Sequence, residues 1–144
     1  MHYLLYVSYA AKEFSEDELR LLLQQSQNNN KDLHITGMLV LLKGRFIQVL
    51  EGERKLIFDL YEKIRKDARH HKVALLLEGE IEKRNFENWS MGFESPDIEE
   101  FEKLTGFEDL DAFFSIKHKK AYDHPALVFM QLFYDKNRRD FFEV

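Results

Sequence analysis

The feature that most constrains the fold is a hairpin pattern in the first half of the chain. Residues 38–42 form a nearly continuous apolar run, which is typical of a strand covered on both faces. Lys43 and Gly44 then offer a two-residue turn, because glycine can adopt positive φ. Residues 45–50 alternate as a returning strand does. We therefore predict a buried antiparallel pair at the centre of the fold.

Gln48 is the exception within this hairpin. The period of two places Phe46, Gln48 and Leu50 on one face of the strand and puts Ile47 and Val49 on the other. A buried side-chain amide without partners would cost about 1–3 kcal/mol. A polar partner must therefore meet Gln48, and it comes either from the protein or from a ligand.

The chain before the hairpin predicts a strand followed by a helix. Residues 2–10 are rich in Tyr, Leu and Val and alternate weakly, which favours a strand with Tyr6 and Ser8 on the same face. Ser15 and Glu18 have the spacing of a capping box, so a helix should follow. The residues spaced to form one face of that helix are Leu19, Leu22, Leu23 and Ser26.

Residues 27–30, with the sequence QNNN, lie where this helix should end. Asparagine tolerates the left-handed conformation, so we expect the run to form a C-cap and a loop. The alternative is a cluster of amides beside a polar ligand. Two histidines at 70 and 71 follow the next predicted helix, but a His-His pair alone is not a metal motif and we expect no metal site.

The order of the remaining elements predicts the fold class. Residues 53–67 have the apolar stripe of a second helix, residues 73–77 form a fourth strand, and residues 84–94 contain a short fifth strand. Strand, helix, strand, strand, helix, strand is the split βαβ order of ferredoxin-like folds. We predict an α+β fold with a five-stranded sheet and two helices on one face.

The C-terminal part of the chain should cover the other face of the sheet. With 144 residues the chain has room for one domain, in which residues 1–94 form the core and residues 95–144 form a helical extension packed on the sheet. Residues 125–134 predict a helix that is apolar on nearly every side. Such a helix can cap the sheet and also meet a second surface, such as another subunit.

Composition excludes several classes of protein. The net charge is −5, which argues against a nucleic-acid partner because phosphate binding favours a basic face. The absence of cysteine removes disulfides, thiolate metal sites and cysteine nucleophiles. We find no secretory leader and no run long enough to cross a bilayer, so we expect a cytoplasmic protein without a membrane partner.

Six motifs, taken together, resemble those of the BLUF family of blue-light receptors, which use a flavin. They span roughly residues 3–93 in the order and spacing of the family. The motifs are LLYVS, SQNNN, ITGML, GRFIQVLEGE, D-x-RHH and R-x-F-x-x-WSM.

The resemblance implies a flavin, usually FAD with FMN possible, held without a covalent bond between the two helices. It implies that Tyr6 is the photoactive tyrosine and that Gln48 links this phenol to the flavin. Trp89 and Met91 match the strand that responds to light. A phenol can give an electron and then a proton to the excited flavin, and an amide carries both a donor and an acceptor.

The resemblance also assigns residues to the flavin site. Lys63 lies near the position where some relatives carry an arginine, and a lysine offers a phosphate only a point charge. The residues assigned to cofactor binding are Tyr6, Ser26, Asn29, Asn30, Ile35, Gln48, Lys63, Asp67, Arg69 and His70.

We therefore predict a photoreceptor rather than an enzyme. Its signal should pass through the fifth strand and the C-terminal helices to a protein partner or a homo-oligomer. One alternative is a flavin-dependent oxidoreductase on the same fold, although no GxGxxG site for a hydride donor is present. The other is a flavin-free interaction adaptor, in which Gln48 would be bonded only to protein.

Overall fold

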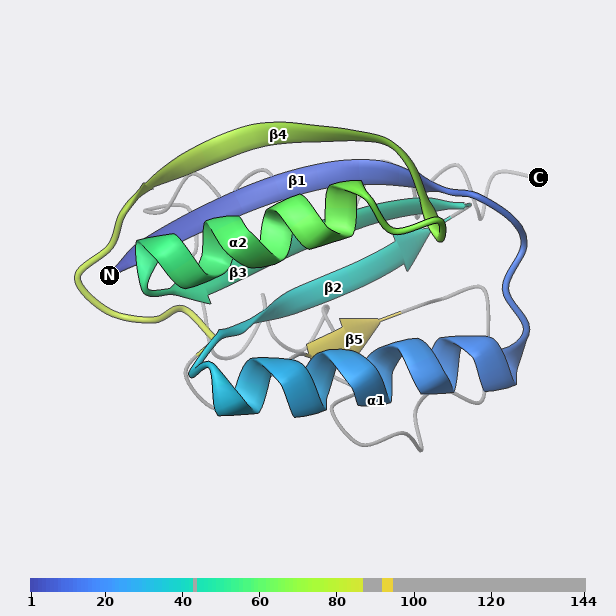
Figure 1. Cartoon of the computed structure of the whole chain (residues 1–144), viewed down its shortest axis with the longest axis horizontal. Helices are drawn as coiled ribbons and strands as arrows, with labels where there is room; N and C mark the ends of the chain where they lie inside the picture. The colour runs from blue at the N-terminus through green and yellow to red at the C-terminus, as the bar shows by residue number, and fades with distance from the viewer. Residues whose placement is uncertain (43, 87–91, 95–144) are drawn as a thin grey trace, which may run out of the picture.

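The computed structural model describes residues 1–42, 44–86 and 92–94, and Figure 1 shows the two helices lying against one side of the sheet. In chain order, the elements are β1 (His2–Ala10), α1 (Glu16–Asp32), β2 (Thr36–Leu42), β3 (Arg45–Gly52), α2 (Arg54–Arg65), β4 (His70–Glu80) and β5 (Gly92–Glu94). The four longer strands and two helices confirm the predicted ferredoxin-like α+β arrangement.

The sheet has the strand order β4-β1-β3-β2-β5. The first four strands are antiparallel to their neighbours, whereas the short β5 runs parallel to β2. In the central part of the sheet, Tyr6 of β1 lies opposite Gln48 of β3, and Gln48 lies opposite Leu39 of β2. These three residues therefore form one row across adjacent strands.

The predicted hairpin is confirmed as β2 and β3. Leu42 pairs with Arg45 at its tip, and Gly44 has φ 75°, in the left-handed region that glycine adopts without strain. Met38 and Val40 are buried on one face of β2 and Leu39 on the other, as expected of a strand covered on both sides.

The start of α1 follows the predicted capping box. Ser15 Oγ accepts a hydrogen bond from the Glu18 backbone N–H at 3.2 Å, and the Glu18 carboxylate accepts one from the Ser15 backbone N–H at 3.3 Å. Leu19, Leu22 and Leu23 on the predicted face are buried against the sheet. Ser15 therefore fixes the helix start with this stripe toward the core.

The end of α1 differs from the prediction. The helix continues through the asparagine run to Asp32, so the expected C-cap and loop at residues 27–30 are wrong. The chain leaves the helix later, where His34 takes φ 54° and Ile35 N–H donates to Asn30 O at 2.8 Å. His34 thus adopts the left-handed conformation that we expected of an asparagine, and the amides of residues 29 and 30 belong to the last helical turns.

Both faces of the sheet carry buried apolar residues. On the helix side, Leu4, Phe46 and Leu50 pack in one cluster with residues of α1 and α2. The side chains buried on the opposite side include Leu5, Met38, Val40, Ile47 and Val49. The predicted C-terminal helical cap, residues 95–144, lies outside the described residues, as do Trp89 and Met91.

Two element boundaries also differ. The second helix ends at Arg65, and β4 begins at His70, three residues earlier than predicted. Lys72 within β4 has φ 52°. The pairing of β4 with β1 shifts register at this point, between the pairs Tyr9–His71 and Val7–Ala74. Among the described residues, neither helix combines the length and apolar character needed to cross a membrane.

Candidate functional site

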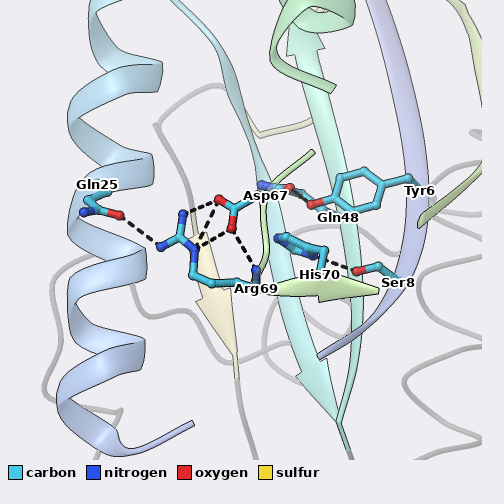
Figure 2. A network of polar contacts seen from close by, with 7 residues as sticks. All are labelled: Tyr6, Ser8, Gln25, Gln48, Asp67, Arg69 and His70. Carbon is cyan, nitrogen blue, oxygen red and sulfur yellow. Dashed lines mark hydrogen bonds and ion pairs between the residues drawn. The ribbon is translucent and has the colours of Figure 1, made fainter. Parts of the chain in front are cut away.

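The floor of the candidate site is the row formed by Tyr6, Gln48 and Leu39. All three side chains point to the helix side of the sheet, and all three are buried. The Tyr6 hydroxyl donates a hydrogen bond to Gln48 Oε1, as Figure 2 shows. The polar partner that the sequence required for Gln48 therefore includes the phenol of the neighbouring strand.

Two helical stripes form the walls of a cavity of about 230 Å³ above this floor. Four of the five α1 residues that line the cavity are spaced at i, i+3, i+4 and i+7, and the four that line the opposite wall repeat this spacing through α2 and the residue after its C-cap. These wall residues are Leu22, Gln25, Ser26 and Asn29 on one side, and Leu60, Lys63, Ile64 and Asp67 on the other. Each stripe starts with leucine and ends with a polar side chain, so both walls present apolar and polar groups to the cavity.

A polar network joins the two walls. Arg69 Nη2 pairs with Asp67 Oδ2 at 2.7 Å, and Arg69 Nη1 donates to Gln25 Oε1 of α1 at 3.0 Å (Figure 2). The Arg69 backbone N–H also donates to Asp67 Oδ1 at 2.9 Å. The hydrogen bonds from the Arg69 side chain are the main reason that the pKa of Asp67 is lowered. Asp67 is therefore a carboxylate at neutral pH and holds Arg69 toward α1.

His70, the first residue of β4, lines the cavity and contacts the neighbouring strand β1. Its Nδ1 lies 2.8 Å from Ser8 Oγ on β1, and its ring centroid lies 4.7 Å from that of Phe46. Burial lowers the pKa of His70 to about 4. The imidazole is therefore neutral at pH 7 and lies edge-on to the Tyr6 ring, with 6.1 Å between centroids.

Tyr6 is the titratable residue of the floor, and its side chain is fully buried. Burial raises the pKa of its phenol far above the usual range, and the nearby Asp67 charge acts in the same direction. The hydroxyl proton is thus retained in the resting protein. Tyr61 lies nearby, with 5.8 Å between the ring centroids, but it does not line the cavity.

The structure brings together most of the residues assigned to the cofactor. Nine of the ten line the cavity: Tyr6, Ser26, Asn29, Asn30, Gln48, Lys63, Asp67, Arg69 and His70. Ile35 does not line it and is instead buried in the core close to Gly52, at the start of the hairpin. Tyr6 and Gln48, which we predict to be photoactive, are adjacent, whereas Trp89 and Met91 fall outside the described residues.

Five lining residues were not predicted. They are Leu22, Gln25, Leu39, Leu60 and Ile64. A usable signal was present, because each helical member is spaced three or four residues from a predicted one. Leu39 could have been found from the hairpin register, since it lies opposite Gln48.

The chemistry of the lining fits a flat heteroaromatic ring with a polar edge. Leu22, Leu60 and Ile64 offer apolar contact, while the buried amides of Asn30 and Gln48 offer both donors and acceptors. The carbonyl and N–H groups at the edge of a flavin ring require this combination. Lys63 and Arg69 add positive charge, which suits a phosphate on the flavin side chain.

Comparison with known proteins agrees with this chemistry. Residues 1–92 match the family model for BLUF, described as sensors of blue-light using FAD. The photoactivated adenylate cyclase subunit beta of Euglena longa is 35% identical over 83 residues, which are 58% of this chain and 10% of that protein. The alpha subunit of Euglena gracilis is 36% identical over 81 residues, or 56% of this chain and 8% of that protein. The matched part is thus about a tenth of these relatives, and the cyclase names describe the longer proteins.

Solved structures give the same result. A bacterial light-regulated adenylyl cyclase is 37% identical with a TM-score of 0.63, covering 67% of this chain and 28% of that one. The photo-activated state of BlsA is 34% identical with a TM-score of 0.61, covering 65% of this chain and 69% of that one. Klebsiella pneumoniae BlrP1 with FMN and cyclic diGMP has a TM-score of 0.75 over 92% of this chain and 35% of that one, but its 22% identity supports the fold alone. This chain belongs to the BLUF family, the sensors of blue light that use a flavin.

Proposed function

We propose that this chain is a blue-light photoreceptor in which Tyr6 and Gln48 are the photoactive pair. The observation that carries the proposal is the hydrogen bond between the phenol and the amide, located at the floor of a cavity that suits a flavin ring. Both side chains are buried, so their bonding depends on the cavity and not on bulk water. A change at this pair can therefore be passed to the protein.

The flavin is held without a covalent bond between α1 and α2. Asn29, Asn30 and Ser26 provide polar contacts from α1, and Lys63 and Arg69 provide positive charge near the other wall. The family description names FAD, and one structural relative contains FMN. The two cofactors share the same ring, so the residues of the floor suit either one, and we infer FAD with FMN as the alternative.

The photochemistry follows from the protonation state of the floor. A bound flavin supplies a ring that absorbs blue light and, once excited, is a strong oxidant. Tyr6 is close to the floor centre, carries its proton at neutral pH and can give up one electron and then the hydroxyl proton. When that proton leaves, Gln48 Oε1 loses its donor. The amide can then settle with its NH₂ and C=O groups exchanged before Tyr6 recovers both electron and proton.

The sheet offers a route from this pair to the C-terminal part of the chain. Gln48 lies opposite Leu39 of β2, and Leu39 lies opposite Phe93 of β5. A change in the bonding of Gln48 is thus two strands away from β5 in the same row. In this proposal β5 and the C-terminal helices pass the signal to a protein partner or to a second copy of the chain.

The proposal is tested with purified protein and two tyrosine variants. Wild type should be yellow, and blue light should shift its absorption reversibly to the red. Tyr6→Phe should keep the flavin and lose the shift, whereas the matched control Tyr61→Phe should keep both, because Tyr61 neither lines the cavity nor bonds to Gln48. A colourless wild type, or an unchanged red shift in Tyr6→Phe, would contradict the proposal.

A further inference from the structure

A buried carboxylate at the end of β3 is not part of the flavin site. Glu51 lies three residues after Gln48 and therefore faces the opposite side of the sheet, and it is fully buried. Burial of an acidic side chain requires compensating donors. The donors that Glu51 uses come from a segment more than thirty residues later in the chain.

The Glu51 carboxylate accepts hydrogen bonds with both of its oxygens. Oε2 accepts from the Asn85 backbone N–H at 2.6 Å and from Asn85 Nδ2 at 3.1 Å, while Oε1 accepts from the Phe86 backbone N–H at 2.8 Å. Two successive backbone amides therefore point at one side chain. Phe86, the second of them, is only 2% exposed, so this contact is enclosed.

Arg84 joins the same segment to the start of β2 and the end of β3 by hydrogen bonds. Its Nη1 donates to Thr36 Oγ1 at 2.8 Å and to the Glu51 carbonyl oxygen at 2.9 Å, and its Nη2 donates to His34 O at 2.6 Å. Thr36 and Glu51 lie opposite each other in the sheet. Residues 84–86 are thus held across the ends of β2 and β3 by hydrogen bonds from three consecutive residues.

The hydrogen bonds of Arg84 lie close to the place where β5 pairs with β2. Arg84 binds β2 at Thr36, and the pairing of β5 with β2 covers Met38 to Val40, beginning only two residues further along. Figure 1 shows β5 next to β2. β5 itself is short and parallel, and a three-residue strand of this kind has little stability of its own. Its register on β2 must therefore depend on where the preceding chain is fixed.

We propose that Glu51 is a positioning residue for light signalling: its carboxylate fixes residues 84–86 to β3, so that β5 starts from a fixed point. A change in the bonding of Gln48 then alters β5 instead of being lost in movement of the chain before it. This inference rests on the proposed light-sensing function. It adds a residue on the face of the sheet opposite the flavin site.

Hydrogen–deuterium exchange of the flavin-loaded protein tests the proposal with an isosteric change. Glu51→Gln replaces one acceptor oxygen by an NH₂ group, so at least one of the Asn85 and Phe86 backbone N–H groups loses its acceptor. We expect exchange in the dark to become about tenfold faster or more at these amides and at those of β5, the factor for losing one bond to a charged group. Glu82→Gln, at an exposed carboxylate nearby, makes the same change in charge and should match wild type.

The light-induced response supplies a readout that a purely structural role would not move. Glu51→Gln should keep the full red shift, because Tyr6 and Gln48 are untouched, but it should lose the light–dark difference in exchange at Gly92–Glu94 that we expect of wild type. Wild-type protection of β5 in the dark, or a light–dark difference of wild-type size, would overturn the proposal.

A second variant and the red shift of wild type cover the two cases in which Glu51→Gln alone would not be enough. If Glu51→Gln does not fold, Arg84→Met removes the three guanidinium hydrogen bonds, leaves the carboxylate in place and should give the same two effects; wild-type behaviour would again overturn the proposal. If wild type shows no red shift, the proposed function fails. The dark exchange of Glu51→Gln then still decides whether Glu51 fixes the segment.

Discussion

Removing both partners of the Tyr6–Gln48 hydrogen bond should cost less stability than the sum of the losses from the two single changes. Tyr6→Phe leaves Gln48 Oε1 without the phenol, and Gln48→Leu leaves the Tyr6 hydroxyl without this acceptor. The two residues are only 0% and 4% exposed, so an unmet polar group there costs about 1–3 kcal/mol. Both side chains also border the cavity, where water can replace part of the loss, which favours the lower end of that range.

The free energy of unfolding of the flavin-free protein, measured with urea, gives the coupling directly. We expect each single variant to lose about 1–2 kcal/mol and the double variant to recover about 1 kcal/mol relative to the sum. Each kcal/mol corresponds to roughly 3–5 °C in Tm for a chain of this size. Tyr61→Phe combined with Gln48→Leu is the matched control and should be additive. Additive behaviour of the Tyr6 and Gln48 changes, within about 0.3 kcal/mol, would refute the reasoning.

Three further predictions concern the surroundings of this pair. Because the pKa of His70 is lowered from 6.5 to about 4, folding favours the neutral imidazole, and the stability that it contributes above pH 6.5 should be lost as the pH falls toward 4. Urea unfolding should show a loss of about 2 kcal/mol between pH 7 and pH 5 that His70→Gln removes, and equal losses in both proteins would contradict this. Arg69→Met should change stability by less than about 1 kcal/mol, since its ion pair with Asp67 is partly exposed, yet it should release flavin faster on dilution; unchanged release would argue against a role in retention. Gly44→Ala should cost about 1–2 kcal/mol in thermal unfolding because of φ 75°, although no described residue beyond its chain neighbours lies within 4 Å of the added methyl group; an unchanged Tm would contradict it.

Local rules predicted the part of the site that depends on strand geometry. The period of two placed Gln48 on the same strand face as Phe46 and Leu50, and the structure confirms this because that face lies against α1 and α2 together with Tyr6. The capping box at Ser15 likewise fixed the start of α1. The resemblance to the family, rather than periodicity, supplied the cavity residues at the helix ends, such as Asn30 and Asp67.

The end of α1 and the contacts between distant parts of the chain were not predicted correctly. The asparagine run was expected to end α1, but the preference of asparagine for helix ends is weak, and the helix continues until His34 leaves it. The bond between Gln25 and Arg69 joins residues 44 positions apart, and that between Glu51 and Phe86 joins residues 35 apart. No local pattern signals such pairs, since they form only when the sheet brings their elements together.

The central claim is that the amide of Gln48 converts photochemistry at Tyr6 into a changed hydrogen-bond pattern around the flavin. The most direct measurement is the light-minus-dark absorption spectrum of flavin-loaded wild type and Gln48→Leu, recorded at equal flavin content. We predict a reversible red shift in wild type and none in Gln48→Leu, because leucine keeps the volume near Tyr6 but has no donor or acceptor. A red shift of wild-type size in Gln48→Leu would contradict the account.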